Sequence, residues 1–213
     1  DIAGAANPFD QPRKMVDAYA PILNATFEKK YGARAMNYYI WPSQMFYCNS
    51  AIKGLADIKG KKVRVQGTSQ GDLAEALGGT GVTIPFAEVV PALQRGTVDC
   101  GITGTMPGYK AKWTEVTNTL FRLPVGYTIG IWVMNQNVWN KLSKDTQALI
   151  EKQMKAHEDK SWKIIEDETE EGVACNTGTG NCTVGAPGKL KLVRPSESDL
   201  KAREKALNEV VLA

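Results

Sequence analysis

Hydrophobic residues recur at every fourth position in the first part of the chain. The residues that share this spacing are Met15, Tyr19, Leu23 and Phe27. Such a period is typical of one face of an α-helix, and it predicts a helix that starts near Asp10 and stops at Gly32. Pro21 lies inside this segment, so the helix is expected to be kinked or split there.

Two segments rich in aromatic residues follow, ARAMNYYIWP and QMFYCNS. Aromatic side chains favour strands, so these segments predict a pair of sheet strands. The chain then alternates between short apolar runs and helical patterns that end at glycines. The predicted elements are strand 62–65, helix 69–77, strand 82–85, helix 86–95 and strand 97–103. This β-α-β-α-β order predicts a parallel sheet.

The second half of the chain predicts two further strands, in LFRLP and GYTIGIWVMN. The latter contains Trp132, and a tryptophan on a strand packs against the sheet more often than it contacts a ligand. Ser143 is a typical N-cap and predicts the start of a long helix that continues to Glu171 and stops at Gly172. A strand in KLKLV and a helix from Ser196 are expected to follow.

The composition is that of a folded chain without a membrane span. The 213 residues are 43% hydrophobic and carry a net charge of +3, so a substantial core is expected. No basic block exceeds KGKK at 59–62, which is too short to indicate a nucleic-acid surface. Nucleic acid is therefore not an expected partner. No apolar run approaches the roughly 18–20 residues that cross a bilayer.

Four cysteines bear on the compartment in which the protein folds. Cys175 and Cys182 enclose the segment CNTGTGNC, whose Gly, Asn and Thr residues favour turns that bring two thiols together. Zinc is disfavoured because the only histidine is His157, far away in a charged segment. A disulfide in an oxidising compartment is favoured over two free thiols.

Catalytic templates fit the sequence poorly. His157 lies in KAHEDK, a pattern typical of an exposed helix surface rather than of a positioned base. The acidic residues between 166 and 171 form a charge run near a predicted helix end, which indicates a solvated face. No acid and base pair is evident, so the protein is not expected to be an enzyme or to need a cofactor.

Arg64 stands in the middle of the strand-like segment VRV and just before a predicted helix. A guanidinium at the carboxyl edge of a parallel sheet, with Thr68 in the following turn, is suited to binding an anion. The alternative is that Arg64 pairs with a structural carboxylate, either Asp72 or Glu88. Both interpretations remain open at this point.

Four segments, in order and spacing, carry a resemblance to a known family. They are LADIKGKKVRV, IPFAEVVPALQRGTVDC, KWTEVTNTLFRLP and VWNKLSKDTQALI. They resemble the periplasmic solute-binding subunits of tripartite ATP-independent periplasmic (TRAP) transporters, the C4-dicarboxylate-binding-protein-like family. The resemblance implies an α/β, type II periplasmic-binding-protein fold with two lobes, crossing strands and a long bracing helix. It also implies that Arg64 forms the ion pair with a ligand carboxylate.

The resemblance assigns the other expected ligand-binding positions. Many members carry a second arginine where this chain has Gln44 and an asparagine where it has Thr103. Three aromatic residues lie on segments that approach the ligand cleft in the family, namely Trp41, Tyr127 and Trp132. An organic acid with one carboxylate and an aromatic or apolar body is therefore plausible. The family fold also places Cys48 near Cys100, which predicts a second disulfide.

The resemblance also predicts how the chain is divided. Residues 1–45 and 128–172 are expected to form a remnant of lobe 1 with the bracing helix, and residues 46–127 and 173–213 lobe 2 with the C-terminal elements. Lobe 1 is expected to be incomplete in this chain, because family members begin with further β-α units.

The expected function is that of a periplasmic receptor that closes on an organic acid and delivers it to the permease subunits of a TRAP transporter. The alternative is the effector-sensing domain of a regulator with the same fold.

Overall fold

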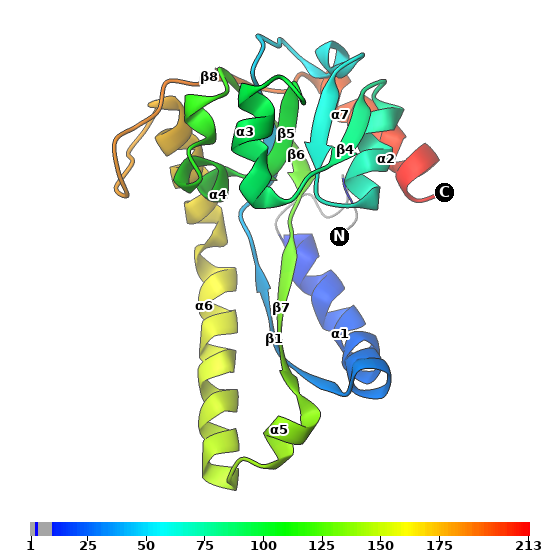
Figure 1. Cartoon of the computed structure of the whole chain (residues 1–213), viewed down its shortest axis with the longest axis vertical. Helices are drawn as coiled ribbons and strands as arrows, with labels where there is room; N and C mark the ends of the chain where they lie inside the picture. The colour runs from blue at the N-terminus through cyan, green and yellow to red at the C-terminus, as the bar shows by residue number, and fades with distance from the viewer. Residues whose placement is uncertain (1–2, 4–9) are drawn as a thin grey trace. The chain divides into compact units, whose positions relative to one another are not determined.

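The computed structural model of the chain describes residue 3 and residues 10–213 (Figure 1). The chain forms two compact units, which are described separately. Of the described residues, unit 1 comprises residue 3 and residues 42–127 and 167–213, and unit 2 comprises residues 10–41 and 128–166. The division expected from the sequence placed the corresponding boundaries at 46 and 173, a few residues later than residues 42 and 167.

Helices and strands alternate along most of the chain. The helices are α1 (Asp10–Tyr31), η1 (Leu55–Ile58), α2 (Thr68–Ala76), η2 (Phe86–Glu88), α3 (Val89–Gln94), α4 (Thr105–Lys110), η3 (Trp113–Glu115), α5 (Gln136–Asn140), α6 (Lys144–Thr177), α7 (Glu197–Ala206) and η4 (Leu207–Val211). The strands are β1 (Ala33–Ile40), β2 (Gln44–Cys48), β3 (Lys62–Val65), β4 (Thr80–Thr83), β5 (Cys100–Gly104), β6 (Thr119–Gly126), β7 (Ile129–Asn135) and β8 (Lys191–Val193).

Unit 1 is built on a six-stranded sheet with the order β4-β3-β5-β2-β6-β8. The strands β4, β3 and β5 run parallel, which confirms the predicted β-α-β-α-β unit. Strand β2 is antiparallel to both of its neighbours, β5 and β6. The sheet as a whole is therefore mixed. The β-α-β-α-β pattern in the sequence predicted only the parallel half of this sheet. Strand β2 precedes that pattern in the chain, so its place in the sheet does not follow from it.

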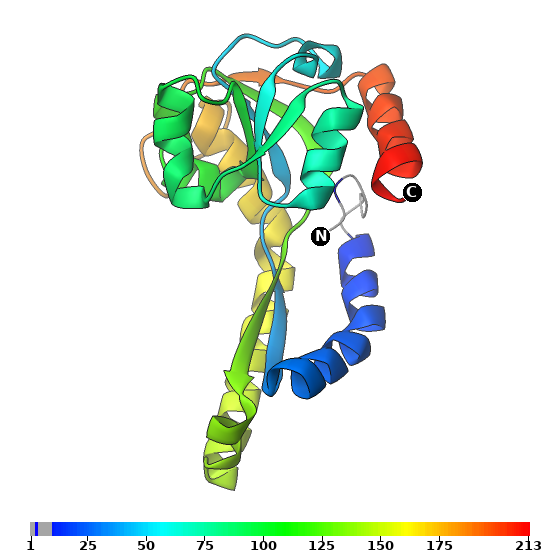
Figure 2. The same cartoon turned by 45° about the vertical axis from the view of Figure 1, so that its right-hand side comes forward.

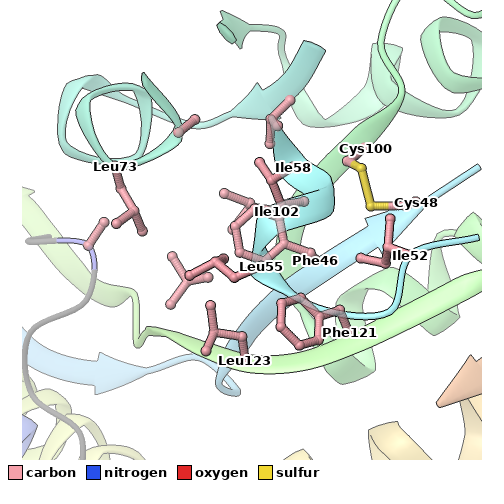
Figure 3. Close-up of a cluster of buried hydrophobic side chains, with 14 of the residues drawn as sticks. Phe46, Cys48, Ile52, Leu55, Ile58, Leu73, Cys100, Ile102, Phe121 and Leu123 are labelled. Atoms are coloured by element: carbon pink, nitrogen blue, oxygen red, sulfur yellow. A yellow bond between two sulfur atoms is a disulfide. The ribbon is translucent and has the colours of Figure 1, made fainter. Parts of the chain in front are cut away.

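The sheet of unit 1 is covered on both faces. One face packs against η1, α2 and α7 through a cluster that includes Phe46, Ile102 and Phe121 (Figure 3). The other face packs against α3 and η3 through a second cluster that includes Tyr47 and Trp113. Alternate residues of β2 belong to different clusters, as the two-residue period of a strand requires. Because all five residues of β2 are buried, this strand lies in the middle of the core.

Both cysteine pairs are joined in unit 1. Cys48 and Cys100 are directly opposite each other on β2 and β5 and form a disulfide at the edge of the first cluster (Figure 3). Cys175 and Cys182 form the second disulfide, which closes the turn-rich loop. Closing loops of these lengths stabilises by roughly 4 and 2–3 kcal/mol on the chain-entropy estimate. The structure thus contains both disulfides expected from the sequence.

Unit 2 contains an antiparallel ribbon formed by β1 and β7 (Figure 1). The register shifts between Ala35 and Asn37, which is the signature of a β-bulge. The consecutive strands β1 and β2, expected as a pair, lie in different sheets. Helix α1 continues through Pro21, and Figure 2 shows that its axis bends along its course. Pro21 therefore does not divide the helix in two.

The ribbon of unit 2 is attached to the N-terminal part of α6 by hydrogen bonds. The Nδ2 of Asn37 donates to the carbonyl of Met154, and the indole of Trp162 donates to the carbonyl of Tyr38. The side chain of Glu158 is only 12% exposed, and it accepts from the backbone N–H of Tyr38 and from the guanidinium of Arg13. Glu158 thus links α6 to both β1 and α1.

Helix α6 is longer than the sequence predicts. Ser143 caps its start by accepting from the N–H of Thr146, as expected, but the helix passes through Gly172 and ends at Thr177. The prediction that Gly172 stops the helix is wrong. A Cβ on Gly172 would overlap the Oγ1 of Thr105, so the glycine allows α6 to lie against the start of α4. The helix stops at Gly178, which has a φ of +70°.

None of the helices within residues 10–213 combines the length and the apolar character needed to span a membrane. Helix α6 is long enough, with 34 residues, but charged side chains occur throughout it.

The close approach at Gly172 gives a first prediction. Gly172→Ala is expected to cost about 1–3 kcal/mol of unfolding free energy, because the added methyl group overlaps Thr105 and the backbone nitrogen of Met106. Gly71→Ala is the matched control, because it lies in α2 and its Cβ would meet nothing within 4 Å. The control is expected to be neutral or stabilising by up to about 1 kcal/mol. Urea unfolding of both variants provides the measurement, and equal midpoints would contradict the packing assignment.

The environment of Glu158 gives a second prediction. Burial alone would raise the pKa of this carboxyl, but hydrogen bonds from Tyr38, Lys155 and Arg13 outweigh burial and hold the pKa below its usual 4.5. The charged form therefore stabilises the fold above about pH 4.5, and this contribution is lost as the pH falls through the lowered pKa. Glu158→Gln is expected to lower the unfolding free energy at pH 7 by about 1–3 kcal/mol.

The matched control for Glu158 is Glu151→Gln, because Glu151 pairs with Arg34 at an exposed position. The control is expected to change the unfolding free energy by less than about 1 kcal/mol. Urea titrations of the parent and both variants at pH 7 and at decreasing pH below 4.5 provide the measurement. A Glu158→Gln deficit that stays constant as the pH falls would show that the carboxylate charge is not the cause.

Candidate functional site

Arg64 is the central residue of the candidate site in unit 1. Its neighbours Val63 and Val65 belong to the first core cluster, so the alternation along β3 places Arg64 on the opposite face of the sheet. Arg64 is directly opposite Gly101 of β5. The residue is only 2% exposed, which is unusual for an arginine.

The guanidinium of Arg64 is held at the carboxyl ends of the parallel strands. Its Nε donates to the carbonyl of Ile84, just after β4, and its Nη1 donates to the carbonyl of Ile102 in β5, each at 2.9 Å. Two hydrogen bonds to backbone carbonyls fix the plane of the group. Ligands bind to open α/β sheets at this end of the strands.

Arg64 has no anionic partner among the residues that the structure describes. It forms an ion pair with neither Asp72 nor Glu88, and its Nη2 makes no hydrogen bond within residue 3 and residues 10–213. Burial lowers the pKa of the guanidinium from 12.5 to about 10. The structural ion pair that the sequence left open is therefore absent from the described part of the chain, and the cation is buried with a free donor.

Two aromatic rings flank the guanidinium, and sequence reasoning missed both. The Cζ of Arg64 lies 5.9 Å from the ring centre of Phe86 and 5.8 Å from that of Trp113, within reach of a cation–π attraction. The two rings are stacked on each other. Gly101 makes room for Trp113, because a Cβ there would lie 2.8 Å from the indole. Both aromatic residues can be read in the sequence, Phe86 in the segment IPFAEV and Trp113 in the segment KWTEV.

Two further polar groups on this face have no hydrogen-bond partner among the residues that the structure describes. Thr103 is opposite Met45 and two residues beyond Gly101 on β5, so it shares the face of Arg64, and its hydroxyl makes no hydrogen bond with the described residues. The Nε1 of Trp113 is buried and has no acceptor within the described ranges. Thr103 thus lies on the same face as Arg64, and Trp113 adds a donor that the sequence did not indicate.

Gln44 lies on the other face of the sheet. It shares the alternation of Phe46 and Cys48 on β2, and its Oε1 accepts from the Nε2 of Gln70 at 2.9 Å. Gln70 in turn accepts from the backbone N–H of Gln66. The strands therefore place Gln44 on the face of the sheet opposite Arg64 and Thr103.

Thr68 is exposed at the start of α2, beside an open hollow of about 520 Å³. The residues that line the hollow are Gln66, Gly67, Thr68, Ser69, Gln70 and Asp72. This turn follows β3 directly, so the N–H groups at the start of α2 lie at the same edge of the sheet as the guanidinium.

The expected aromatic contacts are divided between the two units. Tyr127 is half-buried at the end of unit 1. Trp41 and Trp132 belong to unit 2, where they are 44% and 52% exposed and each contacts the ring of Tyr39. Trp132 thus packs against an aromatic residue of the neighbouring strand of the ribbon while about half of its surface stays exposed.

Three of the titratable groups singled out in the sequence, His157, Glu170 and Glu171, have partners in the structure. His157 is exposed on α6 and contacts Asn37 and the ring of Tyr39. Of the acidic run, Glu170 pairs with Arg122, and Glu171 accepts from Thr183. Within residue 3 and residues 10–213, no group of three or more acidic, histidine or cysteine side chains is arranged to hold a metal ion. The site around Arg64 is suited to binding an anion.

Comparison with known families matches most of the chain. The profile of the bacterial extracellular solute-binding proteins, family 7, matches residues 14–211. The chain belongs to this family. A member of family 7 is a solute-binding protein rather than an enzyme, and the family name places it outside the cytoplasm. The resemblance seen in the sequence is confirmed.

Solved structures share the fold of this family 7 chain. An extracytoplasmic solute receptor from Bordetella pertussis that binds pyroglutamic acid superposes with a TM-score of 0.87 at 18% identity, over 98% of this chain and 66% of that one. A TRAP periplasmic solute-binding protein from Desulfovibrio salexigens with bound orotic acid gives 0.85 at 18% identity, over 99% of this chain and 66% of that one. The mixed α/β fold is therefore that of TRAP solute-binding proteins.

A curated relative was also found by sequence. An uncharacterized protein of Haemophilus influenzae is 26% identical over 157 residues, which cover 72% of this chain and 47% of that protein. This family 7 chain thus spans about half the length of the curated relative and about two thirds of the length of the two solved structures.

Proposed function

We propose that this protein is the periplasmic receptor of a TRAP transporter, which binds an organic acid and delivers it to the membrane permease subunits. The acid places its carboxylate on Arg64. The observation that carries the proposal is the burial of this guanidinium without any anionic partner among the described residues. Transport by capture and release needs no cofactor.

A carboxylate ligand satisfies what Arg64 lacks. Taking a cation out of water costs several kcal/mol unless an opposite charge and hydrogen bonds compensate. The carbonyls of Ile84 and Ile102 satisfy two donors but do not neutralise the charge. A carboxylate at the free Nη2 neutralises it and accepts a charge-assisted hydrogen bond. The hydroxyl of Thr103 supplies a further donor on the same face.

The similar solved structures support an acid as the ligand. The receptor from Bordetella pertussis binds pyroglutamic acid, and the protein from Desulfovibrio salexigens was crystallised with orotic acid. Both are ring compounds that carry one carboxyl group. We also propose that units 1 and 2 are the two lobes of the receptor, with α6 contributing residues to both.

The alternative of an effector-sensing domain in a regulator is disfavoured by the disulfides. Cys48 and Cys100 are fully buried and bonded to each other, and Cys175 is bonded to Cys182. Cytoplasmic proteins rarely keep such bonds, because the cytosol is reducing. A periplasmic receptor is exposed to the oxidising conditions in which they persist.

The proposal predicts how substitutions of Arg64 affect binding. Arg64→Ala is expected to weaken an acid found by thermal-shift screening by about 2–5 kcal/mol, because the desolvated ion pair is lost. Arg64→Lys retains the charge but not the planar fork, so an intermediate loss is expected. Isothermal titration calorimetry provides the measurement, starting from pyroglutamate and orotate as screening probes.

Arg122→Ala is the matched control, because Arg122 lies in the same unit but already pairs with Glu170. Its affinity for the acid is expected to remain within a factor of about three of the parent, which is less than about 1 kcal/mol. If Arg64→Ala also stays within that factor, Arg64 is not the carboxylate-binding residue and the proposed site is misplaced.

A further inference from the structure

The two disulfides of unit 1 differ in their access to solvent. Cys48 and Cys100 lie on neighbouring strands of the sheet, and neither residue is exposed. Cys175 is also buried, in the last turn of α6, but Cys182 is partly exposed in the loop between α6 and β8 (Figure 1). A thiol in solution can therefore approach the second disulfide in the folded protein, whereas the first is reached only when the sheet opens.

The two disulfides also contribute differently to the fold. Cys48 and Cys100 are 52 residues apart in the sequence, and Cys175 and Cys182 are 7 residues apart. The stabilisation that a disulfide provides grows with the length of the loop that it closes, so the second disulfide contributes less. Its reduction is therefore expected to leave the fold of unit 1 intact.

The last part of the loop before β8 is attached to the fold independently of the second disulfide. The N–H of Gly188 donates to the carbonyl of Cys175, and the phenol of Tyr109 donates to the carbonyl of Ala186. These hydrogen bonds hold residues 186–190 against α4 and the end of α6. Breaking the bond between the two sulfurs removes neither of them.

Residues 180–185, which we call the flap, are attached less firmly. The flap is bonded to the rest of the described chain at two points. One is the disulfide of Cys182, and the other is Glu171 of α6, whose carboxylate accepts from the hydroxyl and the N–H of Thr183. The same hydrogen bonds hold the pKa of Glu171 below its usual value. Because hydrogen bonds at the surface contribute little to stability, the disulfide is the stronger attachment.

The flap forms one wall of a hollow of about 480 Å³ in unit 1, to which it contributes Gly180, Asn181 and Thr183. The floor of this hollow is partly apolar. Val173 of α6 belongs to the second core cluster, and Leu192 of β8 packs against that cluster. Movement of the flap therefore changes how much apolar surface unit 1 presents to its surroundings.

We propose that Cys175 and Cys182 form a redox switch that controls the flap. In the oxidised protein the disulfide holds the flap beside the end of α6. In the reduced protein only the hydrogen bonds to Glu171 retain it, so the flap opens and uncovers the floor of the hollow. The switch needs no acid ligand, so this inference does not rest on the proposed function.

The reductant of the proposed switch is a dithiol, of the kind that thiol–disulfide oxidoreductases carry. Its thiolate attacks the sulfur of Cys182, and the sulfur of Cys175 leaves with the bonding electron pair and takes up a proton. The second thiol of the reductant then displaces the sulfur of Cys182, which takes up the other proton. Two electrons and two protons thus pass from the dithiol to the cysteine pair, and the reductant becomes a disulfide.

Graded reduction of the folded chain tests the selectivity of the switch. The protein is incubated with dithiothreitol as the dithiol probe, free thiols are alkylated, and mass spectrometry locates the labels. Cys175 and Cys182 are expected to become labelled at least about tenfold faster than Cys48 and Cys100. Far-ultraviolet circular dichroism is expected to stay unchanged while only the first pair is labelled.

Hydrogen exchange with mass spectrometry tests the opening of the flap. Reduction is expected to speed the exchange of residues 180–185 by about tenfold or more, and to leave residues 191–193 of β8 unchanged. Cys182→Ser, which keeps the buried side chain of Cys175, is expected to show the fast exchange without any reductant.

A second variant tests the role of Glu171. Glu171→Ala is expected to speed the exchange of the flap in the reduced protein severalfold further. Glu168→Ala is the matched control, because Glu168 lies on the same helix and makes no hydrogen bond or ion pair with the described residues. The control is expected to leave the exchange of the flap unchanged.

Three results would overturn the switch. The first is labelling of all four cysteines at the same rate, or of none before the protein unfolds. The second is loss of the circular dichroism signal when only Cys175 and Cys182 are reduced, because the bond would then be needed for the fold. The third is unchanged exchange of residues 180–185 after reduction and in Cys182→Ser. None of these results depends on whether an acid binds at Arg64.

Discussion

The burial of one guanidinium without a compensating anion is the constraint on which the site depends. Arg64 is only 2% exposed on the strand face opposite the first core cluster, so water screens its charge weakly, and burial lowers its pKa to about 10. Among the described residues, Arg64 contacts backbone carbonyls and aromatic rings but no carboxylate. A buried guanidinium without an anion stabilises the ligand-free protein less than an ion-paired or an apolar side chain would. A bound anion pairs with the guanidinium and so removes this loss of stability.

The rest of unit 1 keeps this group in place. The parallel strands β3, β4 and β5 bring the carbonyls of Ile84 and Ile102 to one edge, and Gly101 leaves room for the indole that supports the guanidinium. The disulfide between Cys48 and Cys100 joins β2 to β5 at the other end of the strands. Rigid attachment of this kind reduces the orientational freedom that a ligand has to remove on binding.

Short sequence patterns predicted the features of the fold that neighbouring residues determine. The crossover strands, the helix starts at Ser143 and Ser196, and the position of Arg64 at the carboxyl edge of the parallel strands all follow from short-range spacing and capping chemistry. Gly172 was misread because a helix-stop glycine and a glycine that permits close packing look the same until the partner, Thr105, is placed beside it. The opposite faces of Gln44 and Arg64 depend on the register of β2 and β3 against β5, and no spacing rule within one segment reveals that register. Phe86 and Trp113 meet only in three dimensions.

The central claim is that a carboxylate completes the hydrogen bonding of Arg64. Nuclear magnetic resonance of protein labelled with ¹⁵N-arginine measures this directly, because the side-chain signals of each arginine report on their own partners. On titration with the best acid from a screen, the Nε and Nη signals of Arg64 are expected to shift and its Nη2 protons to become protected from exchange with water. Signals of Arg122, which already has a carboxylate partner, are expected to remain unchanged. Saturation of the protein with the acid while the Arg64 signals stay constant would contradict the account.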